Sequence, residues 1–175
     1  MQHRVVTDYS NVKGNETVKV FVRLRPPADG SEISRQFFRD YQQTQSKITI
    51  LDPRGQTAHN GNEHTFAFNE VFSPERGQED LFLSVAEPLV EKTLQGYNTC
   101  CFAYGQTGSG KTYSMFGPPG HDTVGVIPRA VNQVFQRLVE VQEEKETAVV
   151  VSFLEMYCDQ IRDLGKAYLD KDSAP

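Results

Sequence analysis

Cysteine and tryptophan are scarce in this chain, whose 175 residues include three cysteines and no tryptophan. Cys100 and Cys101 are adjacent and lie in an apolar segment, so the cysteine spacing fits neither a metal site nor a disulfide framework. We expect these two residues and Cys158 to be reduced thiols. Residues 1–15 lack the apolar core of a signal peptide, and no apolar run approaches the length of a membrane span.

Positive charge is also in short supply. The chain has 18 lysines and arginines against 23 aspartates and glutamates, which gives a formal net charge of -5. This balance does not favour a general nucleic-acid-binding protein, and we expect no nucleic-acid partner. Hydrophobic residues make up 38% of the chain, which is enough for a folded core, and the length is that of one domain.

One segment carries specific chemistry. Its eight residues read Gly-Gln-Thr-Gly-Ser-Gly-Lys-Thr and fit G-x-x-x-x-G-K-[ST], the phosphate-binding P-loop. The glycines let the backbone turn tightly around an anion, and successive N–H groups then point toward it. Lys111 is expected to reach the β- and γ-phosphates, and the Thr112 hydroxyl to hold Mg²⁺. The candidate phosphate-binding residues are Gly105, Gln106, Thr107, Gly108, Ser109, Gly110, Lys111 and Thr112.

The segments on either side of this loop are those that the motif requires. The apolar run 99–104 predicts a buried strand before the loop, and 111–116 predicts a short helix that begins at about Gly110. A glycine-rich turn that binds nothing is the alternative. It is disfavoured because all the fixed positions of the motif are present.

Hydrophobic periodicity predicts further strands. Residues 17–24, 47–51 and 64–68 alternate or are β-branched, which is typical of strands. The apolar run 147–156 predicts a buried strand, and 158–164 predicts a turn or short hairpin after it.

Two long helices are predicted as well. Apolar residues recur near a 3.6-residue period over 78–94, with Ser73–Pro74 as a possible helix start, a kink at Pro88 and Gly96 as the C-terminal cap. The second helix begins near Pro128. Strands, helices and the P-loop in this order predict an α/β sheet with helices on both faces and a ligand at the carboxyl ends of the strands.

Several segments, in chain order and spanning residues 18–164, together resemble the kinesin motor domain. The segment Phe66–Pro74 resembles an F-x-F-D-x-V-F motif of that family, although Asn69 replaces the usual aspartate. The segments that carry the resemblance are Val20–Pro26, Phe66–Pro74, Gly96–Met115, Gly125–Arg129 and Ser152–Leu164.

The resemblance implies a P-loop NTPase fold with a mixed central sheet and helices on both faces. It also implies a microtubule-dependent ATPase that uses ATP or ADP with Mg²⁺, has microtubules (tubulin) as partner and is located in the cytoplasm on the cytoskeleton. Arg23, Arg25 and Pro26 would line the adenine side of the nucleotide. Tyr113 lies where the family places a ring against the base, and an aromatic face can stack on a purine.

The sequence shows no match to the two switch segments of the family, which are N-x-x-S-S-R-S-H-like and D-L-A-G-S-E-like. We therefore interpret 17–164 as the N-terminal part of a truncated motor domain, between a disordered extension (1–16) and a polar tail (165–175). No catalytic residue is identifiable. Glu155 is a candidate Walker-B-like acid in an unrelated P-loop enzyme, whereas the resemblance makes it structural.

Two alternative hypotheses stay open. The first is a nucleotide-binding fragment or partner-binding module that does not hydrolyse ATP. The second is a P-loop nucleotide kinase or other NTPase, which would need acceptor-site or lid residues that the sequence does not suggest.

Overall fold

The computed structural model describes residues 18–27, 29–30, 38–39, 45–51, 63–118, 123–141 and 146–165. The extension expected over 1–16 lies outside these residues, as does the polar tail beyond Gly165. The chain divides into two units, Met1–Val134 and Phe135–Pro175, and each is described by itself. No helix among the described residues combines the length and apolar character needed to cross a membrane.

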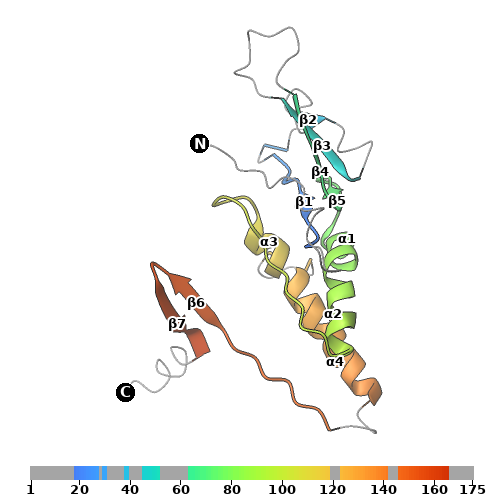
Figure 1. Cartoon of the computed structure of the whole chain (residues 1–175), viewed down its shortest axis with the longest axis vertical. Coiled ribbons are helices and arrows are strands. Elements are labelled where there is room, and N and C mark those ends of the chain that lie inside the picture. Colours follow the sequence, from blue (N-terminus) through green and yellow to red (C-terminus); the bar gives the residue numbers. More distant parts are fainter. Residues whose placement is uncertain are drawn as a thin grey trace, which may run out of the picture. The chain divides into compact units, whose positions relative to one another are not determined.

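The first unit contains two small sheets (Figure 1). Strand β1 (Phe21–Arg23) pairs in parallel with β5 (Glu70–Phe72). The antiparallel sheet has the order β2 (Phe38–Arg39), β3 (Lys47–Leu51), β4 (Glu63–Ala67). The strands predicted at 47–51 and 64–68 are therefore confirmed, whereas the strand predicted at 17–24 is reduced to three residues.

Asn69, which stands where the family motif has an aspartate, makes two hydrogen bonds to the backbone of Val20 just before β1. Its side-chain Oδ1 accepts a hydrogen bond from Val20 N at 2.7 Å, and its own N–H donates to Val20 O at 2.9 Å. A carboxylate oxygen would accept the same bond, so the amide provides the acceptor that an aspartate would provide there.

A helical segment follows β5 and runs without a break from Gln78 to Leu94. It consists of α1 (Gln78–Leu81), a π-helical turn η1 (Phe82–Ala86) and α2 (Glu87–Leu94). Pro88 has no N–H to donate within the helix, and the wider π turn just before it accommodates the proline. The predicted helix is confirmed, and the disturbance expected at Pro88 takes the form of this turn.

The sequence predicted the C-terminal end of this helical segment correctly but not its start. The start expected at Ser73–Pro74 is wrong: those residues form a turn, and the helix begins after Gly77, whose N–H donates to Asp80 Oδ2 at 2.8 Å. The cap expected at Gly96 is confirmed. Gly96 has φ +95°, its N–H donates to Thr93 O at 2.9 Å, and the next N–H donates to Lys92 O at 3.1 Å, which is a Schellman motif.

The core of the first unit lies where β5 meets the helical segment and the start of α4 (Val126–Val141). Phe72 is fully buried there and its ring packs against that of Phe21 on β1. The first part of α4 also contacts α2, where Gln133 Nε2 donates to Glu91 Oε1 at 3.2 Å. The buried members of the cluster are Phe72, Leu81, Phe82, Ala86 and Val126.

The second unit contains a hairpin formed by β6 (Leu154–Tyr157) and β7 (Gln160–Asp163). Cys158 and Asp159 connect the strands, and both have positive φ, 49° and 58°, as expected for a two-residue type I′ turn. This hairpin confirms the turn predicted at 158–164.

Two strand predictions are wrong in the described structure. Residues 98–105 belong to no sheet. Phe102 and Tyr104 are 75% and 95% exposed, and Cys100 and Cys101 are exposed as well. In the run 147–156 a strand begins only at Leu154, and its residues are exposed. A strand is stable when its N–H and C=O groups pair with a neighbour, and 98–105 and 146–152 have no such neighbour among the described residues. For this reason the described strands form three small sheets and not one central sheet.

Candidate functional site

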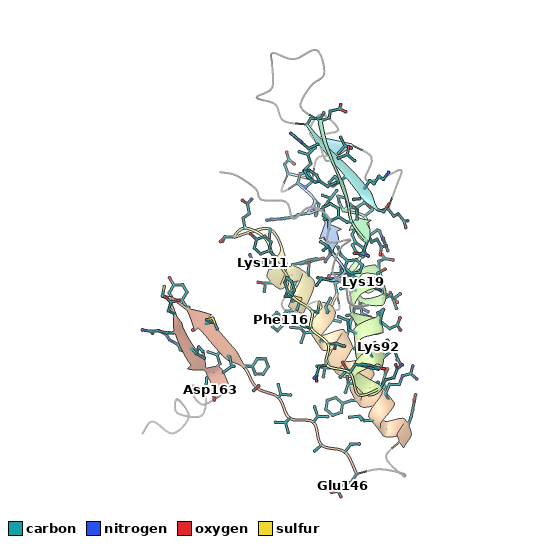
Figure 2. The ribbon with its side chains drawn as sticks, in the orientation of Figure 1. Lys19, Lys92, Lys111, Phe116, Glu146 and Asp163 are labelled. Carbon is teal, nitrogen blue, oxygen red and sulfur yellow. The ribbon has the colours of Figure 1, made fainter. Side chains whose placement is uncertain are left out.

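The P-loop residues form a tight turn that opens directly into a helix. Gly108 and Gly110 have φ of +81° and +98°, a region that strains residues with a side chain. A Cβ on Gly105 would lie 2.5 Å from Ser109 Oγ, so a side chain there would require Ser109 to move. Helix α3 (Lys111–Phe116) follows Gly110, which confirms the predicted helix start. Figure 2 shows Lys111 and Phe116 at the two ends of this helix.

The loop is folded around the Lys111 ammonium group. Lys111 Nζ donates to Gly105 O at 2.9 Å and to Gln106 O at 3.0 Å. These two bonds hold one positive charge inside the turn. A cation surrounded by a glycine-lined loop fits a polyphosphate, because the backbone N–H groups and the ammonium are all donors to anionic oxygen.

Thr112, the predicted Mg²⁺ ligand, is exposed on the first turn of α3, and Gln106 and Thr107 are exposed within the loop. The hydroxyl of an exposed threonine is accessible to a hydrated ion. Among the described residues no group of three or more His, Cys, Asp or Glu residues is placed to hold a metal. A hydroxyl next to a phosphate-binding lysine fits a Mg²⁺ ion that arrives with a nucleotide, since Mg²⁺ often takes its ligands from the substrate phosphates and water.

Arg25 reaches the same loop from the end of β1. Its Nη1 donates to Gly108 O, and the residue is exposed, as is Pro26 next to it. The sequence placed Arg25 and Pro26 on the adenine side. The structure brings the Arg25 guanidinium against the phosphate loop itself, and no contact of Pro26 defines its role.

Arg23, two residues earlier, is only partly exposed and contacts α1 and α3. Its Nη1 donates to Gln78 Oε1 at 2.7 Å and to Ser114 Oγ at 3.0 Å. Its Cζ lies 5.3 Å from the centre of the Tyr113 ring, a cation–π distance. Burial lowers the pKa of the Arg23 guanidinium, and the nearby Tyr113 opposes this effect. The structure therefore brings Arg23 and Tyr113 together, as the sequence had proposed for the base-binding side.

Gln78 is a residue of this site that sequence reasoning missed. It is 2% exposed, and its Nε2 donates to Tyr113 O at 2.6 Å while its Oε1 accepts from Arg23. A glutamine at the first position of a helix is commonly a surface residue, so no motif marked it. The available signal was its spacing, because Gln78, Leu81 and Phe82 follow the i, i+3, i+4 pattern of a buried helix face.

Glu155, the candidate acid, lies in the hairpin of the second unit. It faces Arg162 across the two strands, and Arg162 Nη1 is 3.7 Å from Glu155 Oε2. This cross-strand ion pair gives Glu155 a structural partner.

The chain is similar to known proteins of one family. The model of the kinesin motor domain matches residues 23–173. Kinesin-like protein KIN-14M of Arabidopsis thaliana is 42% identical over 152 residues, which is 84% of this chain and 20% of the relative. Kinesin-like protein KIF15 of Homo sapiens is 39% identical over 183 residues, covering 97% of this chain and 12% of the relative.

A third relative, the protein claret segregational of Drosophila melanogaster, is 38% identical over 163 residues, or 93% of this chain and 22% of the relative. The chain thus spans about one fifth of the length of KIN-14M and of claret segregational. The family match implies a P-loop NTPase-like α/β fold. Since this match covers most of the sequence and includes the P-loop and α3, the chain belongs to the kinesin motor-domain family.

Proposed function

We propose that this chain binds ATP and ADP with Mg²⁺ through Gly105–Thr112, as the nucleotide-binding part of a kinesin motor. The observation that carries the proposal is the conformation of the loop. Two left-handed glycines turn the backbone, and Lys111 Nζ is held by two loop carbonyls at 2.9 and 3.0 Å. The same segment therefore offers an anion both backbone N–H groups and one ammonium group.

Each residue of the loop has a proposed task. Lys111 exchanges its bonds to the Gly105 and Gln106 carbonyls for bonds to the β- and γ-phosphate oxygens. The backbone N–H groups of the loop donate to the same anion. Thr112 holds the Mg²⁺ through its hydroxyl, and the bound ion supplies charge neutralisation between the phosphates.

The base side of the proposed site is formed by Arg23, Pro26 and Tyr113, and Arg25 is assigned to the edge of the phosphate loop, where its Nη1 donates to Gly108 O. The side chain of Tyr113 is 45% exposed while Arg23 lies against its ring. The exposed ring surface is available for stacking on a purine. Stacking does not depend on which hydrogen-bond donors and acceptors the base carries.

Hydrolysis coupled to movement along microtubules is proposed for the complete motor. Phosphoryl transfer needs a positioned water and charge stabilisation beyond a P-loop, and the family's two switch segments would provide them. In the same complete domain we propose a mixed central sheet with helices on both faces. Microtubules are the proposed partner and the cytoskeleton the proposed location.

A nucleotide-binding chain that does not turn over ATP is the second candidate. The sequence has no match to the family's two switch segments, and the ion pair between Glu155 and Arg162 gives the Walker-B-like candidate a structural partner.

Thermal unfolding and steady-state phosphate release together test these two functions. We expect ADP with Mg²⁺ to raise the unfolding temperature, since a ligand that binds only the folded state stabilises it. Absence of any shift would contradict the proposed function. Release of phosphate that increases with added microtubules would favour a complete ATPase, whereas stabilisation without release would favour the second candidate.

A further inference from the structure

We propose that Gln78 is a positioning residue that sets the orientation of the Tyr113 ring and thereby determines how much the base contributes to nucleotide affinity. The inference rests on the proposed nucleotide site and goes beyond it, because the side-chain hydrogen bonds described for Gln78 go to Arg23 and Tyr113 and none goes to the phosphate loop. It acts through two other residues, Arg23 and Tyr113.

The contacts of Gln78 use both ends of its amide. Its Oε1 accepts from Arg23 Nη1 at 2.7 Å, and its Nε2 donates to Tyr113 O at 2.6 Å. An arginine only donates and a carbonyl only accepts, so the two partners define one orientation of the amide. No carboxylate or apolar side chain provides both an acceptor and a donor at these positions.

Tyr113 is thus held at two points. Its carbonyl oxygen lies in the last turn of α3 and accepts from Gly117 N at 2.9 Å in addition to Gln78, so both of its lone pairs are used. Its ring lies against the guanidinium of Arg23, at 5.3 Å from Cζ to the ring centre. Arg23 is itself held by Gln78 and by Ser114 Oγ at 3.0 Å.

Burial makes this arrangement rigid. Gln78 is 2% exposed, and it lies at the start of α1, three positions before Leu81 of the core cluster. A buried polar group that loses its partner is costly, so the amide holds both contacts in the folded state. Tyr113 by contrast is 45% exposed, which leaves ring surface for a ligand. A buried amide therefore fixes an exposed ring whose contact with a base depends on orientation.

The test compares a ligand that has a base with one that has none. The affinities of Mg-ADP and of Mg-tripolyphosphate for the 175-residue chain are measured by calorimetry. Met is similar to Gln in length and lacks both amide groups, so Gln78→Met removes the two contacts. We expect this variant to lose about tenfold in affinity for ADP, which is the lower range of base stacking on an aromatic ring. Its affinity for tripolyphosphate should change by less than about twofold.

Gln95→Met is the matched control, because Gln95 is exposed at the end of α2 and, among the hydrogen bonds described, its side chain accepts only from Lys92 Nζ. We expect no change for either ligand. The second arm places Gln78→Met in a Tyr113→Ala chain. If Gln78 acts through the ring, it has no further effect on ADP affinity there.

Ser114→Ala provides a milder variant that retains the helix. It removes only the second hydrogen bond of Arg23, and we expect a loss of about threefold for ADP alone. Equal losses for ADP and tripolyphosphate in Gln78→Met and Ser114→Ala, or additive effects with Tyr113→Ala, would overturn the inference while the proposed function stands. Failure of the wild-type chain to bind either ligand would overturn both.

Discussion

The two sides of the candidate site are built in different ways. The phosphate side (Gly105–Thr112) takes its shape from backbone conformation, through the left-handed Gly108 and Gly110. The base side (Arg23, Gln78, Tyr113 and Ser114) takes its shape from side-chain hydrogen bonds that join β1, α1 and α3. The phosphate side can be recognised in the sequence from eight consecutive residues. The hydrogen bonds of the base side join residues up to 91 positions apart, and no sequence motif marks them.

Because of this difference, we expect variants of the two sides to differ in which ligand they bind more weakly. Changes on the phosphate side should weaken ADP and tripolyphosphate alike, because both ligands carry the same anionic oxygens. Changes on the base side should weaken ADP alone. The following predictions run from the largest expected effect to the smallest.

Lys111→Ala should abolish detectable binding of Mg-ADP and of Mg-tripolyphosphate. The substitution removes the one side-chain cation that the loop encloses, and charge-assisted bonds to phosphate are among the strongest in proteins. Titration calorimetry measures both ligands. Lys92→Ala is the control, since Lys92 lies on α2 against Tyr97 and should leave both affinities unchanged. Retention of either ligand by Lys111→Ala would break the assignment of the phosphate side.

Tyr113→Ala should weaken ADP by about 1–3 kcal/mol through loss of stacking. Tripolyphosphate should bind as to the wild-type chain. Competition of each ligand against a fluorescent nucleotide measures the two affinities. A loss shared equally by tripolyphosphate would mean that the substitution disturbs α3 and would erase the distinction between the two sides.

Gly110→Ala should weaken both ligands by about 1–2 kcal/mol, the cost of placing a side chain in the left-handed region. Gly110 has φ +98°, whereas Gly77 has φ -78° and a Cβ there would meet Asp80 Oδ2 and Glu79 N at ordinary van der Waals distances of 3.8 and 4.0 Å. Gly77→Ala is therefore the control with the same chemical change and no strain at φ. Calorimetry on the pair of variants should show the loss only for Gly110→Ala, and a loss for ADP alone would contradict the account.

Thr112→Ala should weaken ADP about tenfold when Mg²⁺ is present, the size of a polar contact to a charged group. In EDTA the variant and the wild-type chain should bind ADP equally. Thr112→Ser keeps the hydroxyl and should restore the effect of Mg²⁺. Equal losses with and without the metal would count against a metal-binding role for Thr112.

The phosphate side and the helices were largely predictable from the sequence. The P-loop pattern, the helix start at Gly110 and the Gly96 cap depend on glycine conformation and neighbouring residues, which the sequence states directly. The strands predicted at 99–104 and 147–156 were wrong except for Leu154–Met156, because an apolar run does not say whether a neighbouring strand pairs with it. Gln78 was missed for a related reason, since its partners Arg23 and Tyr113 are 55 and 35 residues away.

The most direct test of the central claim is a titration of the purified chain with fluorescent mant-ADP, with and without Mg²⁺. The account predicts saturable binding that is stronger with Mg²⁺ and absent in Lys111→Ala, because Lys111 and Thr112 supply the phosphate and metal contacts. Binding that neither depends on Mg²⁺ nor changes in Lys111→Ala, or no binding at all by the wild-type chain, would contradict it.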